Sequence, residues 1–153
     1  MRRLSEAFYQ FAITLWVGGL WAIGYLAAPV LFAELGDRQL AGVLAGKLFA
    51  LIGWFGLGAA LYLMVFLFAR SGARALRQAG FWLVLLMAGM AAVQVFGIQP
   101  LMAQLKLDAL PREVMESVFR DRFATWHGIS SIVYLLQSLS GLGLVLWSGR
   151  GLR

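Results

Sequence analysis

The stretch QAGFWLVLLMAGMAAVQVFGIQPLMAQL, residues 78–105, decides the fold, because none of its 28 residues is acidic, basic or histidine. A helix needs about 20 apolar residues to cross the hydrocarbon core of a bilayer. Residues 7–33, 48–69 and 123–149 form three further stretches of this kind, in which His127 is the only exception. The pattern predicts four transmembrane helices, over about residues 7–33, 48–69, 80–104 and 126–148.

The composition of the whole chain agrees with an all-α integral membrane protein. Of its 153 residues 61% are hydrophobic and 13% are charged, whereas a soluble domain carries about 25% charged residues. The length is that of one domain, so we expect a single four-helix transmembrane bundle over residues 1–153. The chain has no cysteine, which excludes disulfides, thiolate metal sites and iron–sulfur clusters.

The distribution of charge predicts the orientation of the bundle. The termini and the connection between the second and third helices carry seven arginines and one glutamate, whereas the other two connections carry six basic and six acidic residues. Lys and Arg accumulate in short segments on the cytoplasmic side. We therefore expect a bacterial-type inner-membrane protein with both termini in the cytoplasm. The expected partners are the lipid bilayer and a second copy of the chain, and not nucleic acid.

Both connections on the outer side are predicted to be helical. Asp37 can cap a helix whose apolar residues follow at helical spacing. Pro111 suits the first turn of another helix, along which an apolar stripe is formed by Val114, Met115, Val118, Phe119 and Phe123. No proline or glycine-rich break separates either segment from the span that follows it. We therefore expect the second and fourth helices to continue beyond the membrane as an outer helical hairpin.

The two halves of the chain show a weak internal repeat. Pro29 stands near the end of the first span and is followed by an amphipathic segment that leads to Lys47-Leu-Phe. Pro100 stands near the end of the third span and is followed by a similar segment that leads to Arg122-Phe-Ala. Each half begins and ends on the same side, so an axis relating the halves would be parallel to the membrane normal.

Polar residues recur at helical spacing on three spans, where lipid cannot satisfy their hydrogen bonds. We expect the polar stripes to face each other inside the bundle, together with methionines that share a face with Gln94. The residues are Gln10, Thr14, Trp21 and Tyr25 on the first span; Met87, Met90 and Gln94 on the third; and His127, Ser130, Ser131, Tyr134, Gln137 and Ser138 on the fourth.

His127 is the only histidine, and its position near the outer boundary allows two interpretations. As a boundary residue it would contact headgroups, water or a backbone carbonyl. As a functional residue it would be a metal or heme ligand, or a proton acceptor. One histidine cannot build the usual zinc site, which has several protein ligands, whereas heme needs only one proximal histidine and a homodimer would supply two.

Other chemistries receive little support from the sequence. Met87 and Met90 would suit copper(I), although methionines at this spacing are more often packing residues. No acidic residue lies in any span, which argues against a carboxylate-coupled carrier. The chain has no phosphate loop, dinucleotide fingerprint or nucleophile–base–acid arrangement. We expect no enzymatic activity and no cofactor, with heme or copper as the alternatives.

Several motifs resemble those of a known family. Trp16-Val-Gly-Gly, Lys47-Leu-Phe and Trp126-His-Gly-Ile-Ser-Ser are similar to a four-span family that includes the eukaryotic transmembrane-protein-205 group and its bacterial domain-of-unknown-function relatives. The resemblance covers nearly the whole chain. The eukaryotic group's association with platinum-drug tolerance implies metal or vesicle handling. Carried over by position, the resemblance implies a role for Lys47, His127, Gly128, Ser130 and Ser131.

More distantly, the layout is similar to the copper-resistance-D-like superfamily, which includes the HemJ-type protoporphyrinogen oxidases. Those proteins are four-span heme proteins, so this resemblance implies a heme site. The first span of the present chain has no histidine, and a single chain therefore cannot supply a heme site with two histidines.

Three hypotheses follow. The first is a small membrane binding or transport module for a metal or heme-like ligand in the outer half of the bundle. The second is a non-catalytic membrane protein that binds a partner or a second copy through its outer hairpin or its glycine faces, so that bulky changes at Gly53 or Gly128 do damage. The third is a heme-dependent membrane oxidoreductase. The candidate ligand-binding residues are His127, Ser130, Ser131, Tyr134, Tyr25, Gln94 and Lys47, with His127 as the metal ligand.

Overall fold

The chain folds into four long helical segments, as the charge-free stretches predict. The computed structural model describes the backbone of residues 2–150 and the side chains of residues 4–149, and the described part contains no β-strand. The four segments that are long and apolar enough to cross a membrane are Leu4–Glu34, Arg38–Arg77, Ala79–Ala109 and Arg120–Gly149, which makes this a multi-pass membrane protein. The elements in chain order are α1 (Arg2–Ala22), the π-helix η1 (Ile23–Ala27), α2 (Ala28–Glu34), α3 (Arg38–Ser71), the 3₁₀-helix η2 (Gly72–Arg77), α4 (Ala79–Ala92), the π-helix η3 (Val93–Ile98), α5 (Gln99–Ala109), the 3₁₀-helix η4 (Val114–Glu116) and α6 (Arg120–Arg150).

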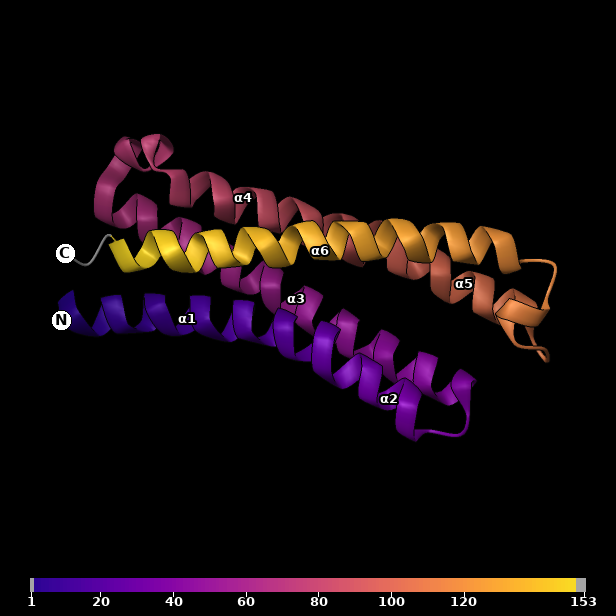
Figure 1. The fold of residues 1–153 in the computed structure, drawn as a ribbon. Helices are drawn as coiled ribbons and strands as arrows, with labels where there is room; N and C mark the ends of the chain where they lie inside the picture. The colour runs from indigo at the N-terminus through magenta and orange to yellow at the C-terminus, as the bar shows by residue number, and fades with distance from the viewer. Residues whose placement is uncertain (1, 151–153) are drawn as a thin grey trace.

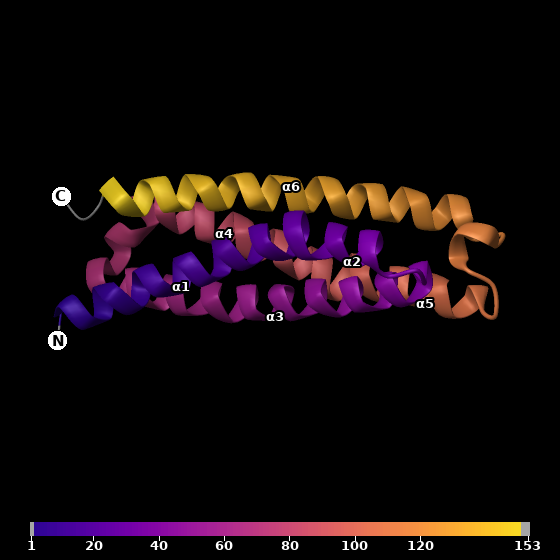
Figure 2. The same cartoon turned by 60° about the horizontal axis from the view of Figure 1, so that its bottom comes forward.

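The segments run up and down the bundle (Figure 1). α1 begins and α6 ends at the same end as η2, and we call this the terminal end. The connections at residues 35–37 and 110–119 lie at the other end, which we call the hairpin end. α1 and α4 each pack against both α3 and α6, so the segments form a ring in cross-section. Figure 2 shows the bundle from the side, with α1 between α6 and α3.

The tightest packing lies between the middle of the bundle and the terminal end. Every long segment contributes side chains that are less than 2% exposed there, whereas α2 and α3 diverge from α5 and α6 toward the hairpin end (Figure 1). The largest of these buried side chains are Ile13, Trp16, Leu20, Leu63, Val84, Met87, Ser138 and Leu144.

Glycines permit close contacts between the helices, as small residues commonly do in membrane proteins. A Cβ atom added at Gly56 would overlap the indole of Trp16, and one added at Gly53 would meet the side chain of Val95. At Gly128, by contrast, no atom of the described residues lies within 4 Å of the added Cβ position. Gly53 is therefore a contact between helices within the chain, and Gly128 presents a free surface.

The first connection at the hairpin end, residues 35–37, agrees with its prediction. The Asp37 carboxylate accepts hydrogen bonds from the backbone amides of Gln39 and Leu40, at 2.8 and 3.0 Å, and thereby caps α3. From that cap α3 runs without interruption to Ser71. The amphipathic segment and the second span are therefore one helix, as expected from the lack of a break between them.

The second connection at the hairpin end, residues 110–119, differs from its prediction. A helix was expected from Pro111 into the fourth span, but α5 ends at Ala109, residues 110–119 hold only the short η4, and α6 begins at Arg120. Leu110 precedes the proline and has a ψ of 144°, outside the helical region. Val118, part of the expected apolar stripe, is 93% exposed. The expected helical hairpin is therefore interrupted on this side.

Each half of the chain also contains a π-helical turn that the sequence did not predict. The Ala28 amide donates to the Ile23 carbonyl, and the Gln99 amide donates to the Gln94 carbonyl, five residues back in each case. Ala28 and Gln99 each directly precede a proline. Because a proline has no N–H and its ring clashes with the carbonyl four residues earlier, a wider turn accommodates it. The same arrangement in both halves supports the internal repeat.

Candidate functional site

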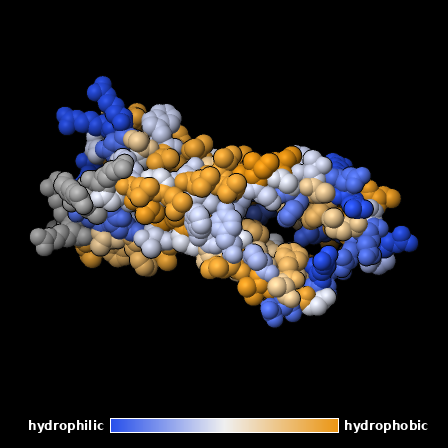
Figure 3. All heavy atoms as spheres, in the orientation of Figure 1, coloured by the Kyte–Doolittle hydropathy of each residue, from blue (hydrophilic) through white to orange (hydrophobic). Residues whose placement is uncertain are grey.

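The hairpin half of the bundle contains a cavity of about 360 Å³. Its wall includes residues of all four long segments and is mainly aromatic and aliphatic. Figure 3 shows the molecule hollowed on its side in this half, between the outer parts of α2 and α6. A volume of this size lies within the range of roughly 300–1,000 Å³ that is usual for small-ligand sites.

Six of the seven candidate residues line this cavity. Tyr25 comes from η1, Gln94 comes from η3, and the other four come from α6. Lys47, the seventh, is exposed on α3 and is not among the lining residues, although its neighbour Gly46 is. The candidate residues that the fold brings together are Tyr25, Gln94, His127, Ser130, Ser131 and Tyr134.

Gln94 and Ser130 form a reciprocal pair in the cavity wall. Gln94 Nε2 donates to the backbone carbonyl of Ser130 at 2.8 Å, and Ser130 Oγ donates to Gln94 Oε1 at 2.9 Å. Gln94 is only 4% exposed, so its amide would be costly to bury without these bonds. The pair fixes α6 against η3 and uses one of the two N–H groups of the Gln94 amide.

Tyr134 connects α6 to the first segment. Its hydroxyl donates to the Leu20 carbonyl at 2.6 Å, and its ring lies so close to Gly24 that a Cβ atom there would overlap it. The ring also meets Phe49 edge-on, with 5.1 Å between centroids, and lies 6.3 Å from Tyr25. The hydroxyl of Tyr134 is therefore used within the chain, while its ring forms part of the cavity wall.

His127 lies where the cavity meets the hairpin end. Its exposed ring stacks on Phe123, one turn earlier on α6, with 6.0 Å between centroids and 11° between the planes. The Lys106 ammonium lies 5.6 Å from the centroid of Phe123 and donates to the Gly42 carbonyl at 3.1 Å. Lys106 therefore bridges α5 and α3 one turn beyond Gly46, which lines the cavity.

Lys106 was not among the candidate residues, because its sequence position indicated only a charge at the end of the third span. Its contacts depend on how α5 approaches α3, which helical spacing cannot reveal. Gly46 and Phe49, which also line the cavity, were not singled out either. Glycines and aromatic residues occur throughout the spans, and only the packing of the helices shows which of them line a cavity.

The remaining polar residues of α6 bond to the backbone between the cavity and the core. Gln137 Nε2 donates to the Met87 carbonyl at 3.3 Å, and Ser138 Oγ donates to the Tyr134 carbonyl at 2.8 Å. Trp21 Nε1 donates to the Ser138 carbonyl at 3.3 Å. Met87 is fully buried in the core, which agrees with the packing interpretation of the methionines.

Thr14 differs from its prediction. We expected it to face the interior with the rest of the polar stripe on the first span, but it is exposed. Its hydroxyl donates to the Gln10 carbonyl on the same helix at 2.9 Å. A threonine that is satisfied within its own helix can face lipid, because no polar atom is left without a partner.

The side chains of the cavity place limits on a bound metal. Among the described residues, no group of three or more His, Cys, Asp or Glu side chains could hold a metal ion. His127 is the cavity-lining residue with an imidazole. No carboxylate or thiolate accompanies this imidazole among the lining residues, whereas a ligand that carries its own metal, such as heme, needs only one imidazole.

Comparison with known proteins identifies a family of undefined activity. A family model described as Domain of unknown function (DUF4149) matches residues 11–110. No curated protein and no solved structure matches the chain. The matched residues include both π-helical turns and Gln94, and they end before α6, which carries His127 and Ser130.

Proposed function

The chain belongs to the DUF4149 family, and from its geometry we propose that it is a membrane binding module that holds a small, mainly apolar ligand in the hairpin-half cavity. The observation that carries this proposal is the cavity itself, about 360 Å³ in volume and lined by residues of all four long segments. A wall of this kind, with a few polar groups, is typical of sites that take small organic ligands.

The composition of the wall favours a flat or aromatic ligand with a hydrogen-bonding edge. Phe49, Tyr25 and Tyr134 offer aromatic surfaces, and Gln99 and Ser131 also line the cavity. Aromatic rings pack well in offset or edge-to-face arrangements, so a planar ligand gains most from such a wall. The internal pairing of Gln94 with Ser130 gives that part of the wall a defined shape.

A heme-like ligand is the finer version of this proposal. His127 would supply one axial nitrogen, and its stacking on Phe123 would orient the imidazole. The resemblance to the transmembrane-protein-205 group, with its link to metal handling, points in the same direction. A bare metal ion is disfavoured because the described residues contain no group of three or more His, Cys, Asp or Glu side chains that could hold one. An oxidoreductase activity would require the same heme.

We further propose that the ligand enters sideways from the bilayer. α2 packs against α3 and η1, and the hollow between α2 and α6 opens on the side of the bundle (Figure 3). When the four segments cross a membrane, that side faces lipid. An apolar ligand dissolved in the bilayer would reach the cavity without passing through water.

Gly46→Leu tests the proposal by filling the cavity. Gly46 lines the cavity, and no described atom lies within 4 Å of an added Cβ there. Leucine also has a higher helix propensity than glycine, so we expect the fold to be at least as stable. Protein purified in mild detergent should contain less extractable small molecule and less heme or iron than the wild type, by mass spectrometry, absorption and elemental analysis.

Gly58→Leu is the matched control on the same helix. Gly58 also has no described atom within 4 Å of an added Cβ, and it lies on the outer face beside Phe55 and Tyr62. It should retain the ligand. Equal ligand content in wild-type and Gly46→Leu protein, or failure of the wild type to hold any extracted molecule or added hemin, would refute the binding proposal. Heme that survives His127→Ala would refute only the heme-ligand version.

A second function, partner binding at the hairpin end, is favoured by a separate observation. Leu107, Leu110, Met115 and Val118 are large apolar side chains that are exposed around the interrupted hairpin. Replacing Met115 and Val118 with serine should then abolish a partner or dimer contact, detected by cross-linking in membranes, while the ligand content stays unchanged.

A further inference from the structure

A second, polar cavity lies at the terminal end, opposite the one described above. Its volume is about 210 Å³, and its lining residues come from α1, α3, α6 and Gln78, which directly precedes α4. The buried core, with Trp16, Leu63 and Met87, separates it from the hairpin-half cavity. The two cavities therefore require separate explanations.

Tyr9 lines this cavity and carries a buried, unused hydroxyl. The side chain is 6% exposed, and its ring stacks on Phe66 with 4.6 Å between centroids. Within the part of the chain that the structure describes, the hydroxyl has no hydrogen-bond partner. A buried polar group without a partner is destabilising, because it has lost its hydrogen bonds to water. A ligand that accepts a hydrogen bond from Tyr9 would remove this destabilisation.

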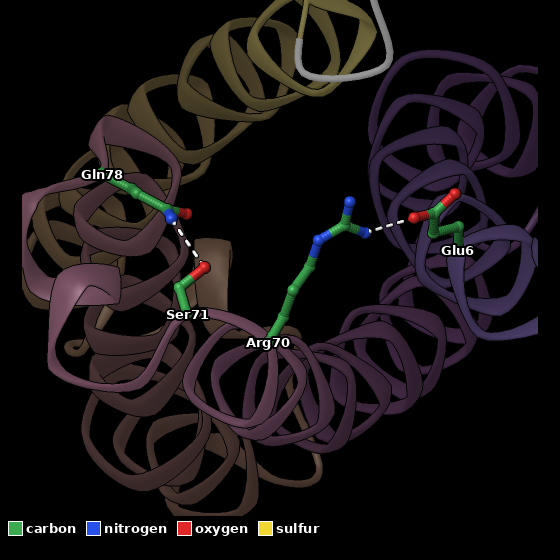
Figure 4. A network of polar contacts seen from close by, with 4 residues as sticks. All are labelled: Glu6, Arg70, Ser71 and Gln78. Atoms are coloured by element: carbon green, nitrogen blue, oxygen red, sulfur yellow. Dashed lines mark hydrogen bonds and ion pairs between the residues drawn. The ribbon is translucent and has the colours of Figure 1, made fainter. Parts of the chain in front are cut away.

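Arg70 brings a cation to the same cavity. Its guanidinium reaches from α3 toward α1 and bonds to the Glu6 carboxylate at 2.6 Å (Figure 4). Only one guanidinium nitrogen takes part in that bond, so the remaining N–H groups are available to a second acceptor. The side chain of Arg70 is 44% exposed, which allows it to exchange one acceptor for another.

The other polar groups of the cavity add donors rather than charge. The Gln78 amide donates to the Ser71 hydroxyl at 3.0 Å (Figure 4), which leaves the hydroxyl proton of Ser71 for another acceptor. The Ser148 hydroxyl donates to the Val145 carbonyl at 2.8 Å and lies 3.4 Å from Gln10 Oε1, which leaves the Gln10 N–H groups as donors. Glu6 is the only acidic residue among the residues lining the cavity.

We propose that this cavity binds a phosphate group, with the Tyr9 hydroxyl and the Arg70 guanidinium as its principal donors and Glu6 as an internal competitor for Arg70. The planar guanidinium matches phosphate oxygens in pairs, and hydrogen bonds to a charged acceptor are the strong ones. The arginine-rich terminal end attracts anions to the region. The phosphate belongs either to a phospholipid headgroup or to a soluble molecule.

Tyr9→Phe is the decisive variant, because it removes only the unpartnered hydroxyl and keeps the ring that stacks on Phe66. The folded chain should therefore be as stable as the wild type. Binding of the probe should weaken about tenfold, the size expected for one hydrogen bond to a charged group. Tyr62→Phe is the matched control, since Tyr62 also lies beside Phe66 but outside this cavity, and its affinity should not change.

Two further variants act on the competition for Arg70. Glu6→Gln removes the competing charge and should tighten binding several-fold, whereas a purely structural ion pair would give no tightening. Arg70→Gln should weaken binding at least about tenfold. Size-exclusion chromatography checks that both variants fold. If either variant fails to fold, Tyr9→Phe still tests the proposal.

The probes are inorganic phosphate and a soluble short-chain phosphatidylglycerol, titrated calorimetrically against the full chain in a maltoside detergent, which contains no phosphate. Binding of both probes with the expected order of variants supports a site for a soluble phosphate. Binding of the lipid alone with the same order supports a headgroup site. If neither probe binds the wild type, or if Tyr9→Phe binds as tightly as the wild type, the proposal is wrong.

Discussion

At Gly24 the absence of a side chain allows the ring of Tyr134 to lie against η1, and the hydroxyl of Tyr134 then reaches the Leu20 carbonyl. The Gln94–Ser130 pair makes an equivalent connection between α6 and η3. In lipid, interhelical hydrogen bonds of this kind are worth about 0.6 kcal/mol on average and reach about 1.7. Single polar pairs therefore shape the cavity without dominating the stability of the bundle.

The Gln94–Ser130 pair gives a prediction at the scale of the residue. Ser130→Ala leaves Gln94 Oε1 without its hydroxyl donor, and Gln94→Leu removes both bonds. Each single change should lower the free energy of unfolding in detergent by about 1 kcal/mol, and a double-mutant cycle should show a coupling of about 0.5–2 kcal/mol.

Ser131→Ala is the control for that cycle, since the Ser131 hydroxyl bonds to the His127 carbonyl of its own helix at 2.9 Å. It should change stability very little. A coupling energy near zero between Gln94 and Ser130 would mean that the bond from Ser130 Oγ to Gln94 Oε1 does not form in the folded protein.

The polar residues that α6 contributes to the cavity could be predicted, because α6 is one uninterrupted helix. A single helical period then relates His127, Ser130 and Tyr134, and the period finds them on one face. Lys106 and Tyr9 could not be found in this way, because their importance lies in contacts with other segments. Thr14 was misjudged because a threonine can satisfy its hydroxyl within its own helix.

At the scale of the element, the two π-helical turns could not be predicted from the pattern of residues. Both precede a proline, and the prolines were evident, but a proline near a helix end usually indicates a kink or a stop rather than a wider turn. The break at residues 110–119 is a related case. There the apolar spacing favoured a helix, while Pro111 and the local bonds of Ser117 favoured a turn.

The cap of α3 gives a prediction at this scale. Asp37→Ala removes the acceptor for the Gln39 and Leu40 amides and should destabilise the protein by about 1 kcal/mol, whereas Asp37→Asn should retain most of the cap. Hydrogen exchange should speed up locally at residues 38–41 in the alanine variant. Unchanged exchange there would show that the carboxylate does not hold the start of α3.

At the scale of the whole molecule, the four-segment architecture could be predicted and the cavities could not. Each charge-free stretch shows that its residues can cross a bilayer, and that property does not depend on the neighbouring helices. The hairpin-half cavity arises where two pairs of segments diverge, which is a property of the packing and leaves no mark in the spacing of residues.

The orientation of the molecule in the membrane is a prediction at this scale. The chain has no cysteine, so Ala73→Cys in η2 and Val118→Cys at the hairpin end each introduce a single thiol. The arginine-rich terminal end is expected in the cytoplasm. An impermeant maleimide should therefore label Val118→Cys in intact spheroplasts and Ala73→Cys only after permeabilisation. The reverse pattern would invert the orientation.

The sideways hollow between α2 and α6 has a consequence for how affinity is expressed. A molecule that enters from lipid first partitions into the bilayer. The occupancy of the cavity then depends on the mole fraction of that molecule in the bilayer rather than on its concentration in water. Adding empty vesicles or detergent micelles would dilute that molecule and raise its apparent Kd in proportion, although nothing in the protein had changed.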